Sequence, residues 1–306
     1  MNGILNVLKP SEMTSFDVVA HLRGLFGTRK IGHAGTLDPL AVGVLPVCIG
    51  RATRAIEFLM DKDKLYRAEL TLGIITDTQD SSGKVLSSVA PECSNEDIEA
   101  AVSSFTGKYL QVPPMYSALK VDGKRLYELA RAGIEIERQQ REVEVYTSQV
   151  LSIDRMNGIK VLLDVHCSKG TYIRTLCADI GERLGCGGHM SFLLRKRAGP
   201  FDISDAYTLE ELAKRKKDGA IQDTLLGVDT IFGNIPGYTL DENTDKKFRN
   251  GMLVLVSHIP DSKDSSKDGS NDDSLIRVYG VTGEFIALGL VKKSEDGIYL
   301  KVKKFF

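Results

Sequence analysis

The sequence predicts an α+β fold, with a large part of mixed strands and helices followed by a small β-rich part. The chain has 306 residues, which suits one large or two ordinary domains, and its 42% of hydrophobic residues can build a sizeable core. Strand-like and helix-like apolar patterns alternate as far as about residue 232. Beyond residue 236 short strand-like pieces dominate. These observations are compatible with the class but leave the topology of the sheet open.

The chain begins with a strand, a turn and a helix. Residues 3–8 form an apolar strand pattern, and residues 9–15 contain the proline and polar residues of a turn. A helix is predicted over residues 15–26, because its apolar residues recur at helical spacing and fall on one face. Gly27 is placed to end this helix.

The same patterns predict the later elements of the large part. Asn95 is a favourable N-cap for one helix, and the capping box at Thr208 and Glu211 opens another. The two prolines at 113 and 114 exclude a helix there. Strands are expected at residues 44–49, 65–72, 143–153, 159–167 and 191–197, and helices at 51–60, 95–105, 124–131, 172–184 and from 208, with a loop at 73–83.

A boundary is expected near residues 232–236, which divides the chain into 1–232 and 233–306. The second part carries strand-like pieces at 252–257, 275–281, 284–291 and 298–305. Between the first two, residues 261–273 are rich in Ser, Asp, Lys and Gly, which predicts a mobile loop.

One stretch, residues 32–46, has an unusual composition for a loop. Three glycines and two prolines indicate a backbone held in a fixed bend, and the single carboxylate of Asp38 lies in its middle, before Pro39. Asp-Pro pairs are common turn formers, so the residues alone favour an ordinary turn. The alternative is a preorganised catalytic acid on a rigid loop against a buried strand.

Composition excludes several classes of site. The five cysteines are scattered without a CxxC pair, and the five histidines include no HExxH motif, so neither predicts a metal site. We expect the cysteines to be reduced thiols. The net charge of −1 argues against a uniformly basic nucleic-acid binder, so any RNA recognition must depend on local patches.

Residues 108–141 form such a patch, with seven basic residues against four acidic ones. A solvated helix face is the simpler interpretation. The other is a lobe that contacts phosphates, with tyrosines available to stack on bases.

The stretch GHAGTLDPLAVGVLP resembles the signature of the TruB family of tRNA pseudouridine synthases. The resemblance implies a catalytic domain around a mixed, largely antiparallel sheet, followed by a small PUA-like RNA-binding β-domain. It implies isomerisation of the T-loop uridine at position 55 in standard tRNA numbering. The motif PPMYSALK is close to the family's RNA-gripping insertion, which favours a phosphate-contacting lobe at 108–141 and the stand-alone bacterial type.

The resemblance also assigns roles to single residues. It implies that Asp38 is the catalytic carboxylate and that Arg174, in the GTYIR motif, is its charge partner. Without the resemblance, Arg174 would be a surface arginine in the first turn of a helix, where a cation opposes the helix dipole. Tyr66 resembles the tyrosine that stacks on the flipped base and can serve in proton transfer, although its pattern alone also fits a core aromatic of a strand.

The remaining assignments concern substrate binding. Tyr172 and Leu193 resemble residues that pack around the base, and His33 resembles one that displaces T-loop bases by stacking. Lys9 is expected to steady the loop from the N-terminal turn. Outside the resemblance, Leu193 would be core and His33 structural. One departure stands out: Glu12 occupies a turn position where the family usually has glycine, which questions the left-handed geometry of that turn.

Three alternatives remain open at this stage: an RNA-binding or RNA-folding factor, a small-molecule enzyme with a lone carboxylate, and the guide-RNA-dependent archaeal and eukaryotic branch of the family. The leading hypothesis needs no cofactor and no guide RNA or protein partner, takes the T-stem-loop of tRNA as its substrate, and expects a monomer. The N-terminus lacks a signal-like pattern and no apolar run could span a bilayer, so we expect a cytoplasmic protein without membrane contact.

Overall fold

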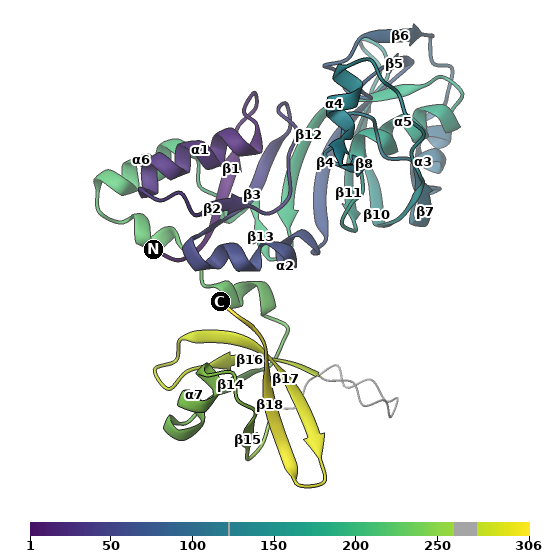
Figure 1. The fold of residues 1–306 in the computed structure, drawn as a ribbon. Helices are drawn as coiled ribbons and strands as arrows, with labels where there is room; N and C mark the ends of the chain where they lie inside the picture. Colours follow the sequence, from purple (N-terminus) through teal and green to yellow (C-terminus); the bar gives the residue numbers. More distant parts are fainter. Residues whose placement is uncertain (122, 260–273) are drawn as a thin grey trace.

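The computed structural model of the chain describes residues 1–121, 123–259 and 274–306. Figure 1 shows an elongated upper body, which contains the first three quarters of the chain, and a smaller lower body near the C-terminus. Within the described residues, the upper body is built on a nine-stranded sheet and the lower body on a five-stranded one. The fold class predicted from the sequence is confirmed.

The large sheet runs in the order β1-β3-β12-β4-β11-β10-β7, with β2 beside β3 and β13 beside β12. Among its described strand pairs only β3 and β12 run parallel, so the sheet is mixed and largely antiparallel. Its strands are β1 (Gly3–Lys9), β2 (Ile31–His33), β3 (Val42–Ile49), β4 (Lys64–Leu72), β7 (Gly107–Gln111), β10 (Arg141–Asp154), β11 (Lys160–Cys167), β12 (Gly188–Ala198) and β13 (Phe201–Asp202).

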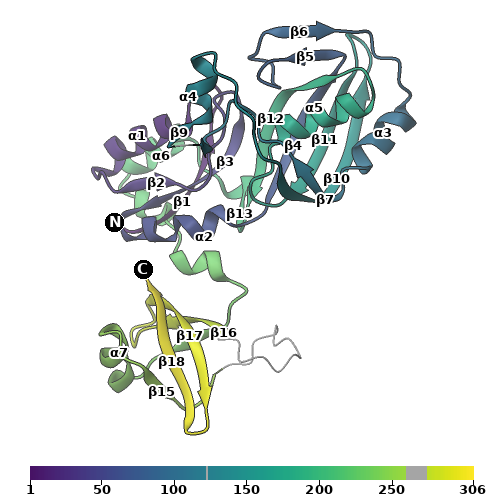
Figure 2. The same ribbon diagram turned by 45° about the vertical axis from the view of Figure 1, so that its right-hand side comes forward.

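Helices cover the two halves of this sheet separately. One core packs α1 and α6 on β1 and β3, and another packs α3 and α5 on β4, β10 and β11. Figure 2 shows α5 and α3 lying along the half of the sheet that is distant from α1. The α-helices of the upper body are α1 (Ser15–Phe26), α2 (Ile56–Met60), α3 (Asn95–Ser103), α4 (Leu126–Arg131), α5 (Ile173–Arg183) and α6 (Leu209–Lys217).

Short elements complete the upper body. They are the two-stranded sheets β5 (Ile74–Thr76) with β6 (Val85–Ser88) and β8 (Lys120–Val121) with β9 (Lys124–Arg125), and the 3-10 helices η1 (Gly50–Ala55), η2 (Ile203–Asp205), η3 (Ile221–Thr224) and η4 (Val228–Phe232).

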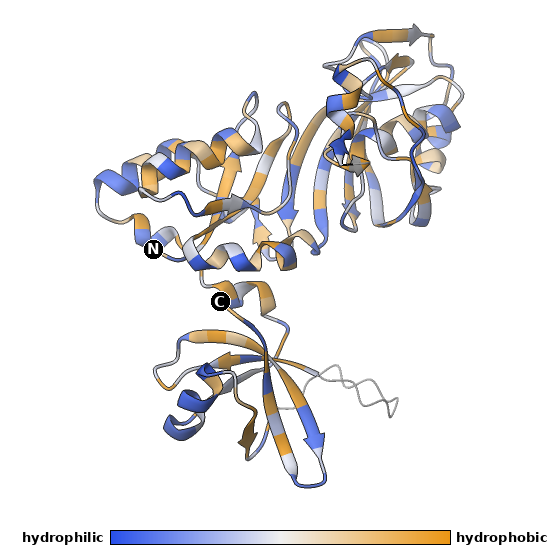
Figure 3. Cartoon of the chain, viewed as in Figure 1, coloured by the Kyte–Doolittle hydropathy of each residue, from blue (hydrophilic) through white to orange (hydrophobic). Residues whose placement is uncertain are grey.

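Strand β3 is buried on both faces. Leu45 and Val47 face the core under α1, whereas Val44 and Cys48 face a second core under α2. A strand covered on both sides needs a continuous apolar sequence, which explains the uninterrupted run from residue 44 to 49. Figure 3 shows β1 and β3 mainly in the hydrophobic colour, in contrast to the hydrophilic surface of α6.

The lower body contains a sheet in the order β14-β16-β17-β18-β15 with α7 beside it. Its core joins that of the upper body through aromatic contacts, because Phe306 packs edge-on against Phe58 of α2 and lies 5.7 Å from Phe232 of η4 between ring centroids. The elements are β14 (Gly237–Thr239), α7 (Glu242–Arg249), β15 (Val254–Val256), β16 (Ser274–Tyr279), β17 (Phe285–Ser294) and β18 (Gly297–Phe305).

Several sequence-based predictions need correction in detail. The expected helix at 51–60 is a 3-10 helix followed by one short α-helix, and the N-cap of α3 is Ser94, whose side chain accepts from the Asp97 backbone, rather than Asn95. The expected loop at 73–83 contains β5 at its start. The predicted mobile loop at 261–273 lies outside the described residues. In the part of the chain that the structure describes, no helix has the length and hydrophobicity needed to cross a membrane.

Candidate active site

Asp38 lies on the loop between β2 and β3, at the point where the two halves of the large sheet meet. The loop is fixed by main-chain contacts on both sides of this residue. The Ser15 hydroxyl accepts from the Leu37 N–H at 2.9 Å and lies 3.2 Å from the Leu37 carbonyl. The Glu12 N–H donates to the Pro39 carbonyl at 2.9 Å. The backbone around the carboxylate is therefore set by the turn and helix that precede it.

Lys9 lies under this loop and is fully buried. Its Nζ donates to the carbonyls of Pro10, Met13 and Pro39 at 2.7, 2.5 and 3.0 Å. Burial lowers the pKa of Lys9 to about 8, while the negative charge of Asp38 acts in the opposite direction. The position of Lys9 fits the predicted role of steadying the loop.

A second buried cation, Arg195, holds the other end of the loop. It is 1% exposed, and its Nε donates to the Val44 carbonyl at 2.7 Å while its Nη2 donates to the Gly35 carbonyl at 3.2 Å. Gly43 lies directly against the Arg195 backbone with φ of 113°, where a Cβ would stand 2.3 Å from the Arg195 carbonyl oxygen. Arg195 was not assigned a role from the sequence, because it is the first of three consecutive basic residues and nothing local distinguishes it from the other two.

Arg174 pairs with Asp38, as the resemblance implied. Its Nε lies 3.0 Å from Asp38 Oδ2, and its Nη1 lies 3.4 Å from Asp80 Oδ2. The Arg174 side chain is only 6% exposed, against 38% for that of Asp38. The carboxylate thus remains open to a substrate, whereas the guanidinium behind it is shielded from solvent.

The second carboxylate, Asp80, was not assigned a role from the sequence. Its side chain is held in a turn, where Oδ1 accepts from the Thr78 hydroxyl at 2.7 Å and from the Ser82 N–H at 3.0 Å. Arg174 also donates to the carbonyls of Thr78 and Tyr116, at 3.3 and 2.9 Å. The polar run from residue 77 to 80 was the signal available in the sequence, but nothing in it indicated that Arg174 would be its partner.

The electrostatics of Asp38 reflect these neighbours. Burial raises the pKa of Asp38 above its ordinary value; the Arg174 cation lowers it and the Asp80 charge raises it again. A carboxylate in such a site has a higher free energy in its charged form than one in water, and it is more basic for that reason. This is a common property of catalytic carboxylates.

Tyr66 and Leu193 face the same side of neighbouring strands β4 and β12. They are 9% and 7% exposed and share a core cluster with Leu37 of the Asp38 loop. Burial raises the pKa of Tyr66, and the nearby Arg195 cation acts against this. The phenol is therefore protonated at neutral pH and can donate a hydrogen bond.

The two other predicted binding residues flank the loop and α5. His33 ends β2; burial and the Arg195 charge lower its pKa, so its imidazole is neutral at pH 7. Tyr172 occupies the N-cap position of α5, two residues before Arg174, and burial raises its pKa. The charge of Asp38 acts on the Tyr66 and Tyr172 phenols and on Lys9.

The basic segment predicted at 108–141 leaves the sheet after β7 and returns to it at β10. The Tyr127 ring has two arginine guanidinium groups over it, Arg125 at 5.8 Å and Arg131 at 5.5 Å from its centroid. Arg138 donates to the Pro113 carbonyl at 3.2 Å. Three of its arginines therefore make contacts within the segment itself. The segment also contacts Arg174, which donates to the Tyr116 carbonyl.

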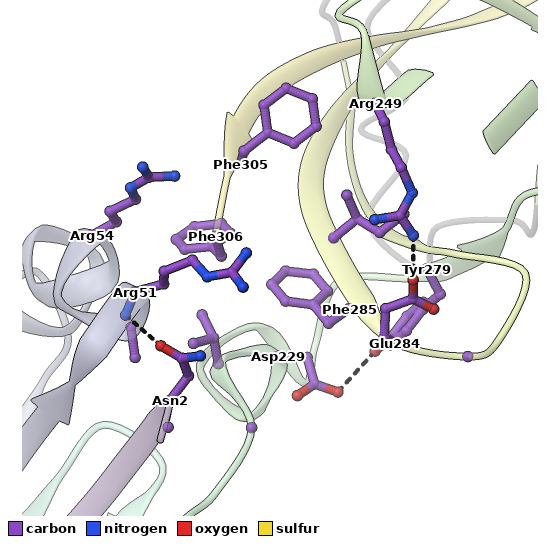
Figure 4. A pocket seen from close by; sticks show the side chains of 16 residues that line it. Asn2, Arg51, Arg54, Asp229, Arg249, Tyr279, Glu284, Phe285, Phe305 and Phe306 are labelled. Atoms are coloured by element: carbon purple, nitrogen blue, oxygen red, sulfur yellow. Dashed lines mark hydrogen bonds and ion pairs between the residues drawn. The ribbon is translucent and has the colours of Figure 1, made fainter. Parts of the chain in front are cut away.

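A separate cavity of about 810 Å³ lies between η1 and the lower body, away from Asp38. Figure 4 shows Arg51 and Arg54 of η1 and, from the C-terminal part of the chain, Phe285, Phe305 and Phe306. None of the predicted site residues lines it. Among the described residues, no group of three or more His, Cys, Asp or Glu side chains could hold a metal ion.

Comparison with protein families gives two adjoining matches. The N-terminal domain of the TruB family pseudouridylate synthases matches residues 23–173, and the C-terminal domain of tRNA pseudouridylate synthase B matches residues 174–232. The chain is 45% identical over 303 residues to the tRNA pseudouridine synthase B of Alkaliphilus oremlandii, covering 99% of this chain and 97% of that protein. It is 44% identical over 309 residues to that of Clostridioides difficile, with both chains fully covered.

Solved structures give the same fold. A chain from an H/ACA RNP bound to a substrate RNA containing 2′-deoxyuridine aligns with a TM-score of 0.73 at 26% identity, covering 99% of this chain and 84% of that one. A chain from a Cbf5-Nop10-Gar1 complex aligns with the same TM-score at 28% identity, over the same shares of the two chains.

Proposed function

The chain belongs to the TruB family of pseudouridylate synthases, and from that membership we propose that it converts the T-loop uridine of tRNA, position 55, to pseudouridine. The observation that carries the proposal is the ion pair between Asp38 and Arg174. Asp38 lies in the motif that resembles the family signature, and its side chain is partly exposed. The proposed enzyme is thus an isomerase.

The reaction breaks the N1–C1′ bond of uridine, turns the uracil and joins C5 to C1′. The proton on C5 leaves and N1 gains one, so all atoms are retained and no electrons are exchanged. Such an isomerisation requires no cofactor. The enzyme must instead extract the nucleotide from its stack, at a cost of a few kcal/mol, and present a carboxylate to it.

Asp38 supplies this carboxylate in the proposal. Arg174 holds the Asp38 side chain in one orientation and, together with Lys9, favours its charged form. The raised pKa makes the carboxylate a better nucleophile or base than an exposed aspartate. Tyr66 and Leu193 would enclose the flipped base, since they face the same side of the neighbouring strands β4 and β12.

Tyr172 would bound the same pocket at the start of α5. We propose that His33 stacks on the displaced T-loop bases. Its imidazole is neutral, so stacking does not require a charged group to be removed from water. Lys9 acts in the proposal through the loop, not on the nucleotide, because its Nζ donates to three main-chain carbonyls.

The wider RNA contact is proposed to come from two regions. Residues 108–141 carry a local charge excess and exposed lysines such as Lys124, and would grip the T-stem-loop. Residues 233–306 would form a PUA-like RNA-binding domain attached to the catalytic domain, residues 1–232. The curated relatives that match the full chain are named as tRNA enzymes. We propose that this chain acts on tRNA in the cytoplasm as a monomer, without a guide RNA or protein partner.

The direct test is chemical mapping of pseudouridine in a T-stem-loop RNA incubated with the purified protein alone. The proposal expects a single modified position, the T-loop uridine, without added cofactor, metal or second protein. RNA that is bound but never modified would favour the RNA-folding interpretation. An absence of binding even at low salt, where phosphate contacts are strongest, would favour a small-molecule enzyme.

A further inference from the structure

Gln111 is a buried polar residue that has no role in the isomerisation proposed for Asp38. It is 2% exposed and is the last residue of β7, the strand from which the basic segment leaves the sheet. Its carboxamide makes three hydrogen bonds. Oε1 accepts from the Tyr172 N–H at 2.8 Å, and Nε2 donates to the Tyr172 carbonyl at 3.1 Å and to the Tyr109 hydroxyl at 2.6 Å.

This pattern is a clamp on one peptide segment. A carboxamide that binds both the N–H and the C=O of one residue fixes that residue as a neighbouring strand would, and each amide hydrogen has an acceptor. Tyr172 has no side-chain cap hydrogen bond of its own, although it stands at the N-cap of α5. Gln111 therefore holds the residue at which the first turn of α5 begins, and this turn carries Arg174.

The clamp joins two parts of the site that are distant in sequence. Strand β7 is the root of the segment proposed to grip RNA, and Tyr172 and Arg174 line the proposed pocket. A second link runs in parallel, since Arg174 Nη2 donates to the Tyr116 carbonyl of the same segment at 2.9 Å. The RNA-gripping segment and the pocket are thereby held in a fixed relation.

We propose that Gln111 is a positioning residue for uridine isomerisation, which sets Tyr172 and Arg174 in register with RNA held by residues 108–141. The inference rests on the proposed function. A misplacement of about 1 Å at a catalytic centre can lower a rate about 100-fold, without a matching loss of binding. Gln111 should therefore affect the rate constant of the bound complex rather than the affinity for RNA.

The test compares Gln111→Met with the wild type in single-turnover reactions at saturating T-stem-loop RNA. Methionine keeps the size of the side chain and removes all three hydrogen bonds. We expect the rate constant to fall about 10- to 100-fold, while the dissociation constant for RNA, measured by filter binding, stays within about threefold. A rate constant within twofold of the wild type, or a loss of affinity alone, would overturn the inference.

Two further variants keep the test decisive. Tyr109→Phe leaves both hydrogen bonds between Gln111 and Tyr172 in place, so its rate should fall much less than that of Gln111→Met. A loss equal to that of Gln111→Met would assign the effect to core packing and refute the clamp. If Gln111→Met does not fold, Gln111→Glu replaces it, because a carboxylate still accepts from the Tyr172 N–H but cannot donate to the Tyr172 carbonyl. A wild-type protein that makes no pseudouridine would refute the proposed function itself, which separates the two failures.

Discussion

Arg174 Nε lies 3.0 Å from Asp38 Oδ2, and the same guanidinium reaches Asp80 with a second nitrogen. Two carboxylates thus share one buried cation, but they differ in access to solvent, with 38% of the Asp38 side chain exposed against 13% of that of Asp80. Asp80 anchors the arginine, and Asp38 is the carboxylate that we propose meets the substrate. The planar guanidinium allows this bridge because its nitrogens point in fixed, divergent directions.

Replacing Arg174 by lysine should lower the rate of pseudouridine formation about 100-fold or more. An ammonium is a point charge that cannot reach both carboxylates with the geometry of a guanidinium. The measurement is a single-turnover rate at saturating RNA. Arg67→Lys is the matched control, because Arg67 makes a two-point ion pair with Asp164 at 2.8 and 2.9 Å that involves none of the site residues. Equal losses in both variants would contradict a specific role for Arg174.

The rate should depend on the protonation of Asp38. Because the pKa of Asp38 in the folded protein is raised, the rate should fall on acidification with a midpoint above the ordinary aspartate pKa of about 3.9. Asp80→Asn removes a charge that raises this pKa, so its midpoint should move to lower pH. A pH–rate profile, with circular dichroism to confirm folding at each pH, measures both. A midpoint that moves upward in Asp80→Asn would contradict this electrostatic account.

Glu12 adopts a left-handed backbone conformation, with φ of 67°. The turn therefore has the left-handed geometry that the family's usual glycine would adopt. In Glu12 this geometry is strained, because the Cβ comes too close to the following carbonyl oxygen. Glu12→Gly should raise the free energy of unfolding by about 1 kcal/mol, measured by urea denaturation. Glu12→Gln keeps the Cβ and removes the charge, and should leave stability unchanged. If glutamine stabilises as much as glycine, the charge and not the backbone is responsible.

Gly43 fixes the approach of β3 to β12. Gly43→Ala should destabilise the protein by several kcal/mol and lower the rate, because its Cβ would stand 2.3 Å from the Arg195 carbonyl oxygen and φ is 113°. Gly24→Ala in α1 is the control, since a Cβ there has no neighbour within 4 Å. It should stabilise by about 0.5–1 kcal/mol. Thermal unfolding of both variants measures the contrast, and similar midpoints would contradict the close approach.

The sequence predicted best what local patterns encode. Helix α1 spans residues 15–26 as expected, because its apolar face, its capping box and Gly27 all agree. The capping box at Thr208 is also present. By contrast, the periodicity of apolar residues could not predict the strand order. That order depends on pairing between segments that are far apart in the sequence, such as β4 and β12.

The residues of the site were likewise predicted only where a local sequence pattern marks them. The Asp38 loop was found because glycine, proline and aspartate form a contiguous motif. The roles of Asp80, Arg195 and Gln111 could not be found, because their partners lie far away in the sequence and are mostly main-chain atoms. A buried carboxamide or guanidinium bound to carbonyls leaves no local pattern.

The most direct test of the account is Asp38→Asn with a T-stem-loop RNA. The amide keeps the size of the side chain and removes its charge, so the account predicts RNA affinity within a few-fold of the wild type and no detectable pseudouridine. Pseudouridine formed by Asp38→Asn at a rate near that of the wild type would contradict the central claim that this carboxylate performs the chemistry.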